Sequence, residues 1–301
     1  MNFRRHKNNN KRTNERNNLF ENMLGKVHNK PISLHNKPIS LHNKPNEKYF
    51  WENVNEPTIW VSLLIPSYDT KKEYLVSCIE SIKNQTGTFG LEVVWINDYS
   101  NDVNSKILIE LLDTIIKPLK NCKLIYKILE KNSGISFCLH YGVNLCSNEI
   151  IFRMDSDDIM KYDRIEKQLK FINSTPSCVM CGTNITSFED VNGIYSSISE
   201  SKHKDILTWE EYKKYPKDWI LNHPTLCFKK TAILNIGNYR ENFTYPFEDL
   251  ELELRVLKFY GVLYNLSECL VFYRIHNNQI TSKNTGTKDI LIKSMIQHMI
   301  K

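Results

Sequence analysis

The sequence predicts an α/β fold, and the order of its apolar and amphipathic segments indicates it. From residue 59 onward, short apolar runs alternate with stretches whose apolar residues recur every three or four positions. The runs predict strands and the amphipathic stretches predict helices, because each pattern matches the period of one structure. Strands joined by helices cross over in a right-handed sense, so we expect a mostly parallel sheet with helices on both faces.

The expected elements can be placed along the chain in order. Strands are predicted over residues 59–66, 91–97, 122–129 and 149–154. Helices are predicted between them, over residues 71–85, 101–116 and 135–146. The pattern is clear in the first helix, because Leu75, Cys78, Ile79 and Ile82 share one face.

Composition places limits on the class of protein. The chain has 301 residues, of which 41% are hydrophobic and 25% charged, with a mean hydropathy of −0.44. This suffices for one large or two modest domains. No apolar window approaches the ~18 residues of a membrane span, and residues 1–5 do not begin a signal peptide. We therefore expect a cytoplasmic protein without a transmembrane segment.

The eight cysteines are scattered, mostly inside apolar segments, and are expected to be reduced core residues. Two of them, Cys178 and Cys181, have the spacing of a redox motif. They lie in an apolar run and not at a helix N-terminus, which would lower a thiol pKa, so they predict a core strand.

The net charge of +6 is concentrated at one end of the chain. Residues 1–50 hold eleven Lys and Arg against three Glu, a net charge of +8, so the other 251 residues carry −2. The main part of the protein therefore has no basic surplus with which to bind nucleic acid, and we expect no nucleic-acid partner.

The basic segment contains a repeat, in which residues 28–34 recur as residues 35–41. Pro31, Pro38 and Pro45 exclude a coiled coil of the same seven-residue period, because each would break a helix. We expect residues 1–57 to form a disordered basic repeat tail. A peptide ligand, an RNA-touching arm and a histidine metal tract are alternatives that rest on composition alone. At the other end, residues 281–301 predict a C-terminal helical extension.

An acidic cluster follows the fourth predicted strand. Asp155, Asp157 and Asp158 lie in one expected turn, and no Lys or Arg lies among them. Converging carboxylates repel each other unless a cation lies between them, and oxygen ligands suit Mg²⁺ or Mn²⁺. The alternative is that this turn only caps the helix beginning near Lys161.

Other motifs accompany the acidic cluster. They are PSYD at 66–69, Asn97-Asp98, and the segments 130–136, 154–158, 164–168, 223–225, 246–249 and 273–276. In order and spacing, residues 58–280 resemble family 2 of the inverting GT-A glycosyltransferases. The resemblance implies a GT-A domain with a Rossmann-like sheet. It also implies a hexosyl- or N-acetylhexosaminyltransferase whose donor is a nucleotide diphosphate sugar, expected to be a UDP-sugar. The acceptor would be a hydroxyl of a glycan, protein or lipid.

The resemblance also implies which residues bind the donor. Pro66, Tyr68 and Asp98 would line the nucleobase pocket, with Asp98 accepting a hydrogen bond from a uracil-like imide. Asp155 would face the ribose and the metal. Asp157 would bind the Mn²⁺ or Mg²⁺ that bridges the two phosphates.

The remaining roles fall in the last third of the chain. Asp249 would be the base and Glu248 would shape the acceptor site, although an acidic pair before a helix is also a common N-cap. His276 would reach the metal, or lie on the surface after a strand. Arg274 would neutralise a phosphate.

Two positions depart from the family pattern, and two residues are expected to support the site. Tyr99 stands where the family commonly has glycine and His140 where asparagine is frequent, so ribose and diphosphate contacts there are less certain. Arg164 and Gln168 are expected to orient the acidic turn.

Two rival functions share part of this pattern. A metal-dependent nucleotidyltransferase or polymerase also uses acidic pairs on a sheet, and a nucleotide-sugar-binding module would lack turnover. Metal-dependent release of nucleoside diphosphate would separate a glycosyltransferase from both, because a nucleotidyltransferase releases pyrophosphate. The sugar and acceptor are set by residues 187–222 and the C-terminal segment. The aromatic residues there either stack on sugars or pack, and they are Trp209, Tyr212, Tyr215 and Trp219.

Overall fold

The computed structural model describes residues 48–53, 56–191, 194–241, 247–277, 279 and 286–301. The HNKPISL repeat and most of the expected tail lie outside these residues. The predicted α/β class is confirmed, and strands and helices of the first half follow the predicted order. The fold below concerns the described residues alone.

Within those residues, ten strands form one sheet in the order β3-β2-β1-β4-β9-β6-β10-β5, with β7 paired to β6 and β8 paired to β10. Their bounds are β1 Trp60–Ser67, β2 Gly90–Asn97, β3 Cys122–Ile128, β4 Ile150–Arg153, β5 Ile159–Met160, β6 Met180–Val191, β7 Ile194–Glu200, β8 Ile206–Thr208, β9 Cys227–Lys229 and β10 Val262–Arg274. Strands β3, β2, β1 and β4 are parallel, as are β6 and β10, whereas β9 runs antiparallel to both β4 and β6.

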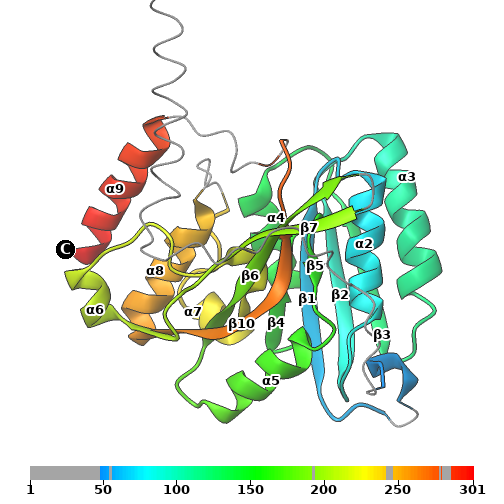
Figure 1. Cartoon of the computed structure of the whole chain (residues 1–301), viewed down its shortest axis with the longest axis horizontal. Coiled ribbons are helices and arrows are strands. Elements are labelled where there is room, and N and C mark those ends of the chain that lie inside the picture. The colour runs from blue at the N-terminus through cyan, green and yellow to red at the C-terminus, as the bar shows by residue number, and fades with distance from the viewer. Residues whose placement is uncertain (1–47, 54–55, 192–193, 242–246, 278, 280–285) are drawn as a thin grey trace, which may run out of the picture. The chain divides into compact units, whose positions relative to one another are not determined.

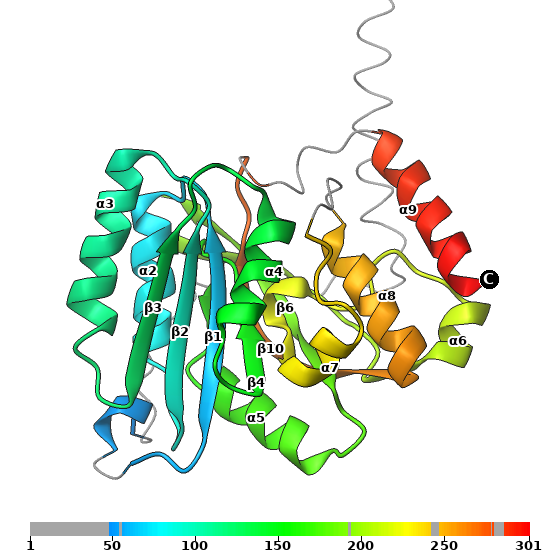
Figure 2. The ribbon, with the colours of Figure 1, turned by 180° about the vertical axis from the view of Figure 1, so that it is seen from behind.

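Helices cover both faces of the sheet (Figures 1 and 2). Their bounds are α2 Lys72–Lys83, α3 Asp102–Leu111 with a continuing π-turn Leu112–Ile116, α4 Ile135–Leu145, α5 Arg164–Ser174, α6 Trp209–Lys214, α7 Lys230–Asn235, α8 Glu248–Tyr260 and α9 Gly286–Ile300. Two short 3₁₀ turns, Phe50–Glu52 and His223–Thr225, complete the set for the described residues.

The pleat of the strands divides the core into two clusters. Val61, Leu63 and Ile65 of β1 pack with α2, α3 and α5, whereas Leu64 packs with α4, α7 and α8. This is the expected result of side chains alternating across a strand that is buried on both faces. Gly142 of α4 lies against Leu64 so closely that a Cβ there would be 2.2 Å from its Cδ1.

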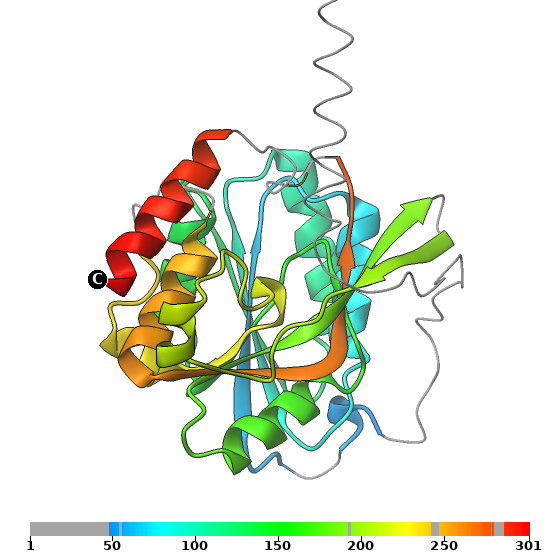
Figure 3. The same cartoon turned by 60° about the vertical axis from the view of Figure 1, so that its left-hand side comes forward.

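The C-terminal helix α9 packs beside α8, and the β6–β7 hairpin leaves the sheet on the side away from α9 (Figure 3). Ile292 and Ile296 of α9 are buried in the second core cluster. The predicted helical extension is therefore a helix that adds to the core. Among the described residues, none of the helices has both the length and the apolar character needed to span a bilayer.

The boundary expected between tail and domain is wrong by several residues. Phe50 is fully buried and stacks on Phe89 with ring centroids 5.4 Å apart. The indole of Trp51 donates a hydrogen bond to the Lys83 carbonyl oxygen, at 2.9 Å. Residues 48–53 therefore belong to the folded domain, because an aromatic pair in a polar segment can supply apolar burial that composition averages conceal.

We expect Phe50→Ala to lower the free energy of unfolding by about 3 kcal/mol, because it leaves a cavity beneath Phe89. Urea denaturation measures the change. Val103→Ala, at an exposed position of α3, is the control and should change stability by less than about 0.5 kcal/mol. Equal stability of the two variants would contradict the packing of this segment.

Candidate functional site

The carboxyl ends of β1, β2 and β4 meet at one edge of the sheet, and side-chain hydrogen bonds tie the loops that follow. The Asp69 Oδ1 accepts hydrogen bonds from the backbone N–H of Asn101 at 2.9 Å and from its side-chain amide at 2.7 Å. Tyr99, which stands in place of a glycine, has φ 62°. The glycine-like backbone is therefore kept at this turn without the glycine, at a local conformational cost.

A pocket of about 920 Å³ opens at this edge. It lies where ligands bind in α/β sheets, outside the carboxyl ends of the strands. Nearly all of the predicted site residues line it, although they come from separate parts of the chain. They are Pro66, Tyr68, Asp98, Asp155, Asp157, Glu248, Asp249 and His276. Arg274 does not line the pocket.

Asp98 joins the end of β2 to the start of α4. Its two carboxylate oxygens accept backbone hydrogen bonds from Ser133 at 2.7 Å and Gly134 at 2.8 Å, and only 4% of the residue is exposed. Each oxygen has a second lone pair. Asp98 therefore fixes the N-terminus of α4 beside the pocket, whether or not a nucleobase binds there.

The acidic turn is not free of cations, which corrects the sequence-based expectation. Arg153 at the end of β4 pairs with both oxygens of Asp155, with N···O distances of 2.6 and 2.8 Å. The two residues lie on the same side of the chain because side chains repeat every second residue in extended backbone. Burial raises the pKa of Asp155, and the Arg153 guanidinium opposes that shift.

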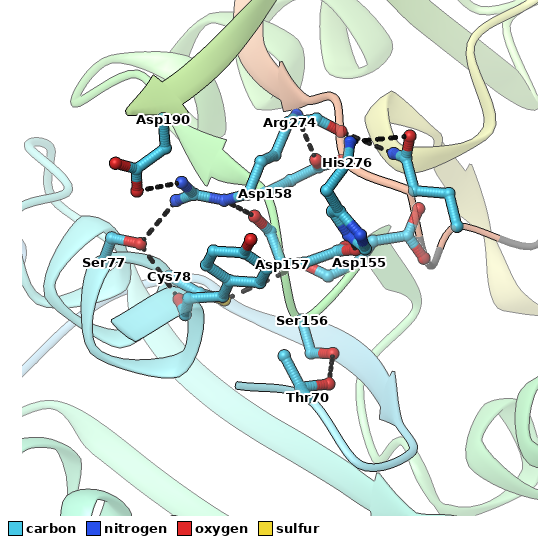
Figure 4. Close-up of polar contacts among 12 residues, drawn as sticks. Thr70, Ser77, Cys78, Asp155, Ser156, Asp157, Asp158, Asp190, Arg274 and His276 are labelled. Carbon is cyan, nitrogen blue, oxygen red and sulfur yellow. Dashed lines mark hydrogen bonds and ion pairs between the residues drawn. The ribbon is translucent and has the colours of Figure 1, made fainter. Parts of the chain in front are cut away.

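The side chains of Asp157 and His276 lie next to each other in the pocket wall (Figure 4). The Asp157 Oδ2 lies 2.9 Å from Nε2 of His276. The imidazole also lies against the Tyr74 ring, at a centroid distance of 5.2 Å. A residue from the end of β10 is thereby brought to the acidic turn 119 positions earlier in the chain.

The side chains of the acidic turn and His276 could supply part of the ligand set of a divalent cation. Asp157 and His276 offer one carboxylate and one imidazole to the pocket. Asp155 is held by Arg153 and is a poor additional ligand. Over the part of the chain that is described, no three His, Cys, Asp or Glu side chains gather tightly enough to enclose a metal. Two protein ligands suit Mg²⁺ or Mn²⁺, which often take their other ligands from substrate phosphates and water.

Arg274 is a buried support and not a phosphate ligand. Its guanidinium is 0% exposed and donates to the Asp157 carbonyl oxygen at 2.8 Å, to Asp190 at 2.7 Å and to Ser77 at 2.8 Å (Figure 4). It also lies 4.3 Å from the Tyr74 ring centroid. The expectation fails because these partners come from three distant elements and hold the side chain behind the turn.

Asp158 lies on the same hidden side of the turn. It is fully buried and its Oδ1 accepts the backbone N–H of Arg274 at 2.9 Å. Burial raises the pKa of Asp158 well above its ordinary value, and the charges of Asp157 and Asp155 add to that shift. Of the three acidic residues, the turn therefore presents Asp157 and Asp155 to the pocket and keeps Asp158 beneath them.

Glu248 and Asp249 begin α8 and also line the pocket. Burial, together with the neighbouring Asp249 charge, raises the pKa of Glu248 to about 8. His223 lies 3.9 Å from Glu248, and burial together with Arg153 holds the pKa of His223 well below its usual value. At neutral pH Glu248 is therefore mostly protonated beside a neutral imidazole.

Comparison with known proteins identifies the family. The family model described as "Glycosyl transferase family 2" matches residues 62–234, more than half of the chain. This chain belongs to glycosyl transferase family 2. It is a glycosyltransferase with a GT-A fold, and of the functions expected from sequence this is the one that the family supports.

Relatives and solved structures agree with this assignment. An uncharacterized glycosyltransferase of Haemophilus influenzae is 29% identical over 214 residues, covering 70% of this chain and 74% of the relative. The amylovoran biosynthesis glycosyltransferase AmsE of Erwinia amylovora is 28% identical over 241 residues, covering 78% of this chain and 83% of the relative. The crystal structure of S. aureus TarS 1–349 in complex with UDP-GlcNAc has a TM-score of 0.61 at 17% identity. The match covers 80% of this chain and 66% of that one.

Some residues around the acidic sites of this glycosyltransferase could be given a role from sequence, and others could not. Arg153 was detectable, since an arginine at the end of an apolar strand is unusual without a partner. His223 was part of a motif, but its hydrogen-bond partner Tyr239, with Nε2 2.9 Å from the hydroxyl, lies in a different segment. Arg164 donates to the Arg153 carbonyl oxygen at 2.7 Å, which places it behind the turn as expected.

The four aromatic residues that sequence left undecided fall into separate environments. Trp219 lines the pocket and is 56% exposed. Tyr212 is fully buried, Trp209 stacks on it at 6.0 Å, and Tyr215 is 71% exposed without lining the pocket. Both cysteines of the CxxC spacing, Cys178 and Cys181, are buried, and Cys181 lies in strand β6 whereas Cys178 lies two residues before it.

We expect Glu248→Gln to remove part of the pH dependence of stability. Folded Glu248 keeps its proton up to about pH 8 whereas an unfolded glutamate loses it near 4.5. The free energy of unfolding therefore falls as pH rises through this window. At pH 8 the free energy of unfolding of the glutamine variant should be higher than that of the parent by at least about 1 kcal/mol. At pH 5 the difference should be smaller.

Urea denaturation at the two pH values measures this difference. Glu110→Gln, on the exposed side of α3, is the matched control. Its free energy of unfolding should equal that of the parent at both pH values. A constant offset between Glu248→Gln and the parent would show that this carboxyl does not titrate as described.

Proposed function

We propose that this glycosyltransferase moves a sugar from a UDP-sugar to an acceptor hydroxyl with inversion at the anomeric carbon. The observation that carries the proposal is that one pocket is lined both by the acidic turn after β4 and by Asp249 at the start of α8. The two groups reach the pocket from different elements. The acidic turn can thus bind the departing diphosphate while Asp249 contacts the attacking hydroxyl.

The donor nucleotide would lie over the ends of β1 and β2. Pro66 and Tyr68 line this part of the pocket. Tyr68 is 55% exposed, so its ring can pack against the nucleobase of the donor. Asp98 and the N-terminus of α4 lie beside them. The UDP-GlcNAc held by TarS supports a uracil nucleotide as the donor, because the two proteins share the fold.

The diphosphate would lie at Asp157 and His276. These two side chains would hold Mn²⁺ or Mg²⁺, with Asp155 near it but engaged by Arg153. A divalent cation there, when bound, neutralises the charge that collects on the departing diphosphate. His276 and Asp157 are held in place by Tyr74 and Arg274, so the chain positions them before the donor binds.

Asp249 would act as the base. It takes the proton from the acceptor hydroxyl as that oxygen forms a bond to the anomeric carbon. The bond between the anomeric carbon and the phosphate oxygen breaks, and its electron pair leaves with the nucleoside diphosphate. Attack from the face opposite the leaving group inverts the configuration.

Glu248 suits a different part of this reaction. Its raised pKa leaves it protonated near neutral pH, so it can donate a hydrogen bond to the acceptor or donor sugar but is a poor acceptor for a proton. The amylovoran biosynthesis role named for AmsE supports an acceptor hydroxyl on a glycan or a lipid.

Asp157→Ala should abolish sugar transfer and the metal dependence of nucleotide binding, because one of two protein ligands is lost. The fold should persist, since removing a carboxylate from a repulsive cluster relieves strain. Isothermal titration with UDP, with and without Mn²⁺, measures this. Glu189→Ala, outside the pocket on β6, is the control. Unchanged Mn²⁺-dependent UDP affinity in Asp157→Ala would assign the metal to other residues.

Asp249→Asn tests the base directly. The amide keeps the shape of the side chain and can still accept the 2.7 Å hydrogen bond that the Leu250 N–H donates, but it cannot take the proton. Turnover should fall by ~10²- to 10⁴-fold while affinity for the UDP-sugar is retained. The assay follows release of UDP in the presence of acceptor, and pyrophosphate release would indicate a nucleotidyltransferase.

The matched control is Asp102→Asn, an exposed aspartate in the first turn of α3 that does not line the pocket, whose turnover should stay within about tenfold of the parent. If Asp249→Asn also stays within about tenfold, the proton is taken by another group.

A further inference from the structure

The wall of the pocket also contains an exposed indole on a firmly held segment. Trp219 and Asp218 both line the pocket, and Trp219 is 56% exposed. An isolated exposed aromatic residue on a surface needs no explanation. This one lies inside a pocket beside a carboxylate.

Contacts on both sides fix the segment that carries the indole. The Tyr212 hydroxyl donates to the Lys217 carbonyl oxygen at 2.8 Å. After Trp219, Ile220 and Leu221 are buried in the core. The backbone is therefore held immediately before and after the exposed pair, and the exposure of the indole is a feature of the fold.

The ring itself is held from behind. His203 meets Trp219 edge-on, with centroids 4.7 Å apart and an interplanar angle of 86°. His203 is in turn fixed by Asn184, whose Oδ1 accepts its backbone N–H at 3.0 Å, and by Asn222, whose Oδ1 lies 3.3 Å from Nε2. The indole is thus supported by His203 while more than half of the residue remains exposed at the pocket.

An exposed indole next to a carboxylate matches the chemistry of a sugar ring. A pyranose has a face of C–H groups that packs on an aromatic ring, and hydroxyl groups at its edge that donate to a carboxylate. Pockets commonly combine such apolar walls with a few polar groups that fix orientation.

The position of Trp219 along the sheet separates it from the nucleotide. Its support His203 is bonded to Asn184 of β6, and Asn222 donates to the Thr183 carbonyl oxygen of the same strand at 2.7 Å. In the sheet, β6 lies four neighbours from β2, which carries Asp98. At ~4.8 Å a step, β2 and β6 are roughly 19 Å apart along the sheet.

We propose that Trp219 and Asp218 form a subsite that binds a pyranose ring of the acceptor, so that the acceptor is a glycan. The proposal rests on the glycosyl transfer proposed above. It adds the chemical class of the second substrate and two residues that recognise it. The indole binds the C–H face of the ring, and the Asp218 carboxylate accepts hydrogen bonds from its hydroxyls.

Saturation-transfer NMR on the full chain tests the subsite without knowledge of the natural acceptor. The probes are the methyl glycosides of glucose, galactose, N-acetylglucosamine and N-acetylgalactosamine, each added with UDP and Mg²⁺. At least one glycoside should receive saturation, most strongly at ring C–H protons. Trp219→Ala should weaken that signal about five- to tenfold, and Trp219→Phe should keep most of it.

Tyr215→Ala is the matched control. Tyr215 lies four positions before Trp219, is 71% exposed and does not line the pocket, so its removal should leave the glycoside signal unchanged. Asp218→Asn should reduce the glycoside signal by more than about twofold, since an amide accepts weaker hydrogen bonds from hydroxyls than a carboxylate does. The UDP signal should be the same in the parent and all four variants.

Three outcomes would overturn the subsite. A parent protein that saturates UDP but none of the glycosides has no such subsite. A Trp219→Ala variant that keeps the glycoside signal binds the sugar elsewhere, and one that loses UDP in parallel places Trp219 at the donor. Failure of the parent to bind UDP would instead overturn the proposed function, and the subsite with it.

Discussion

The site depends on how the protein keeps three carboxylates together at the end of one short strand. Like charges at this separation repel strongly when partly buried. Two buried guanidinium groups stabilise the turn: Arg153 pairs with Asp155, and Arg274 donates to the Asp157 carbonyl oxygen, while the Arg274 backbone N–H donates to the Asp158 carboxylate. Asp157 is left facing His276 in the pocket. The arrangement fixes the turn before any substrate or cation binds, which is the condition for electrostatic preorganisation.

The same two arginines connect the site to the rest of the fold. Arg274 ends β10, so the path of this long strand beside β6 decides where its guanidinium and His276 lie. Its contacts with Ser77 and Asp190 join α2 and β6 to the acidic turn. Because breaking one partner of a buried charge leaves the others uncompensated, these elements are expected to move together or not at all.

How far sequence could predict this protein depended on whether an element is set by local or distant contacts. Strands β1 to β4 and helices α2 to α4 follow from periodicity, and the acidic turn follows from its place after a strand. The antiparallel β9, the two-residue β5 and the burial of Phe50 could not be predicted, since each depends on partners far along the chain. Arg274 was assigned to phosphate because its charge is visible in sequence and its burial is not.

The adjacent acids that begin α8 illustrate how helix geometry can give two similar side chains different tasks. Successive residues of an α-helix point about 100° apart around its axis, so Glu248 can be more deeply buried than Asp249 although both line the pocket. Burial then separates their chemistry, because it raises the pKa of Glu248 and the charge of Asp249 raises it further. Asp249, the half-buried member of the pair, is consequently suited to take a proton, and the buried Glu248 to hold one. An acidic pair that would otherwise only cap a helix thereby acquires a donor and an acceptor.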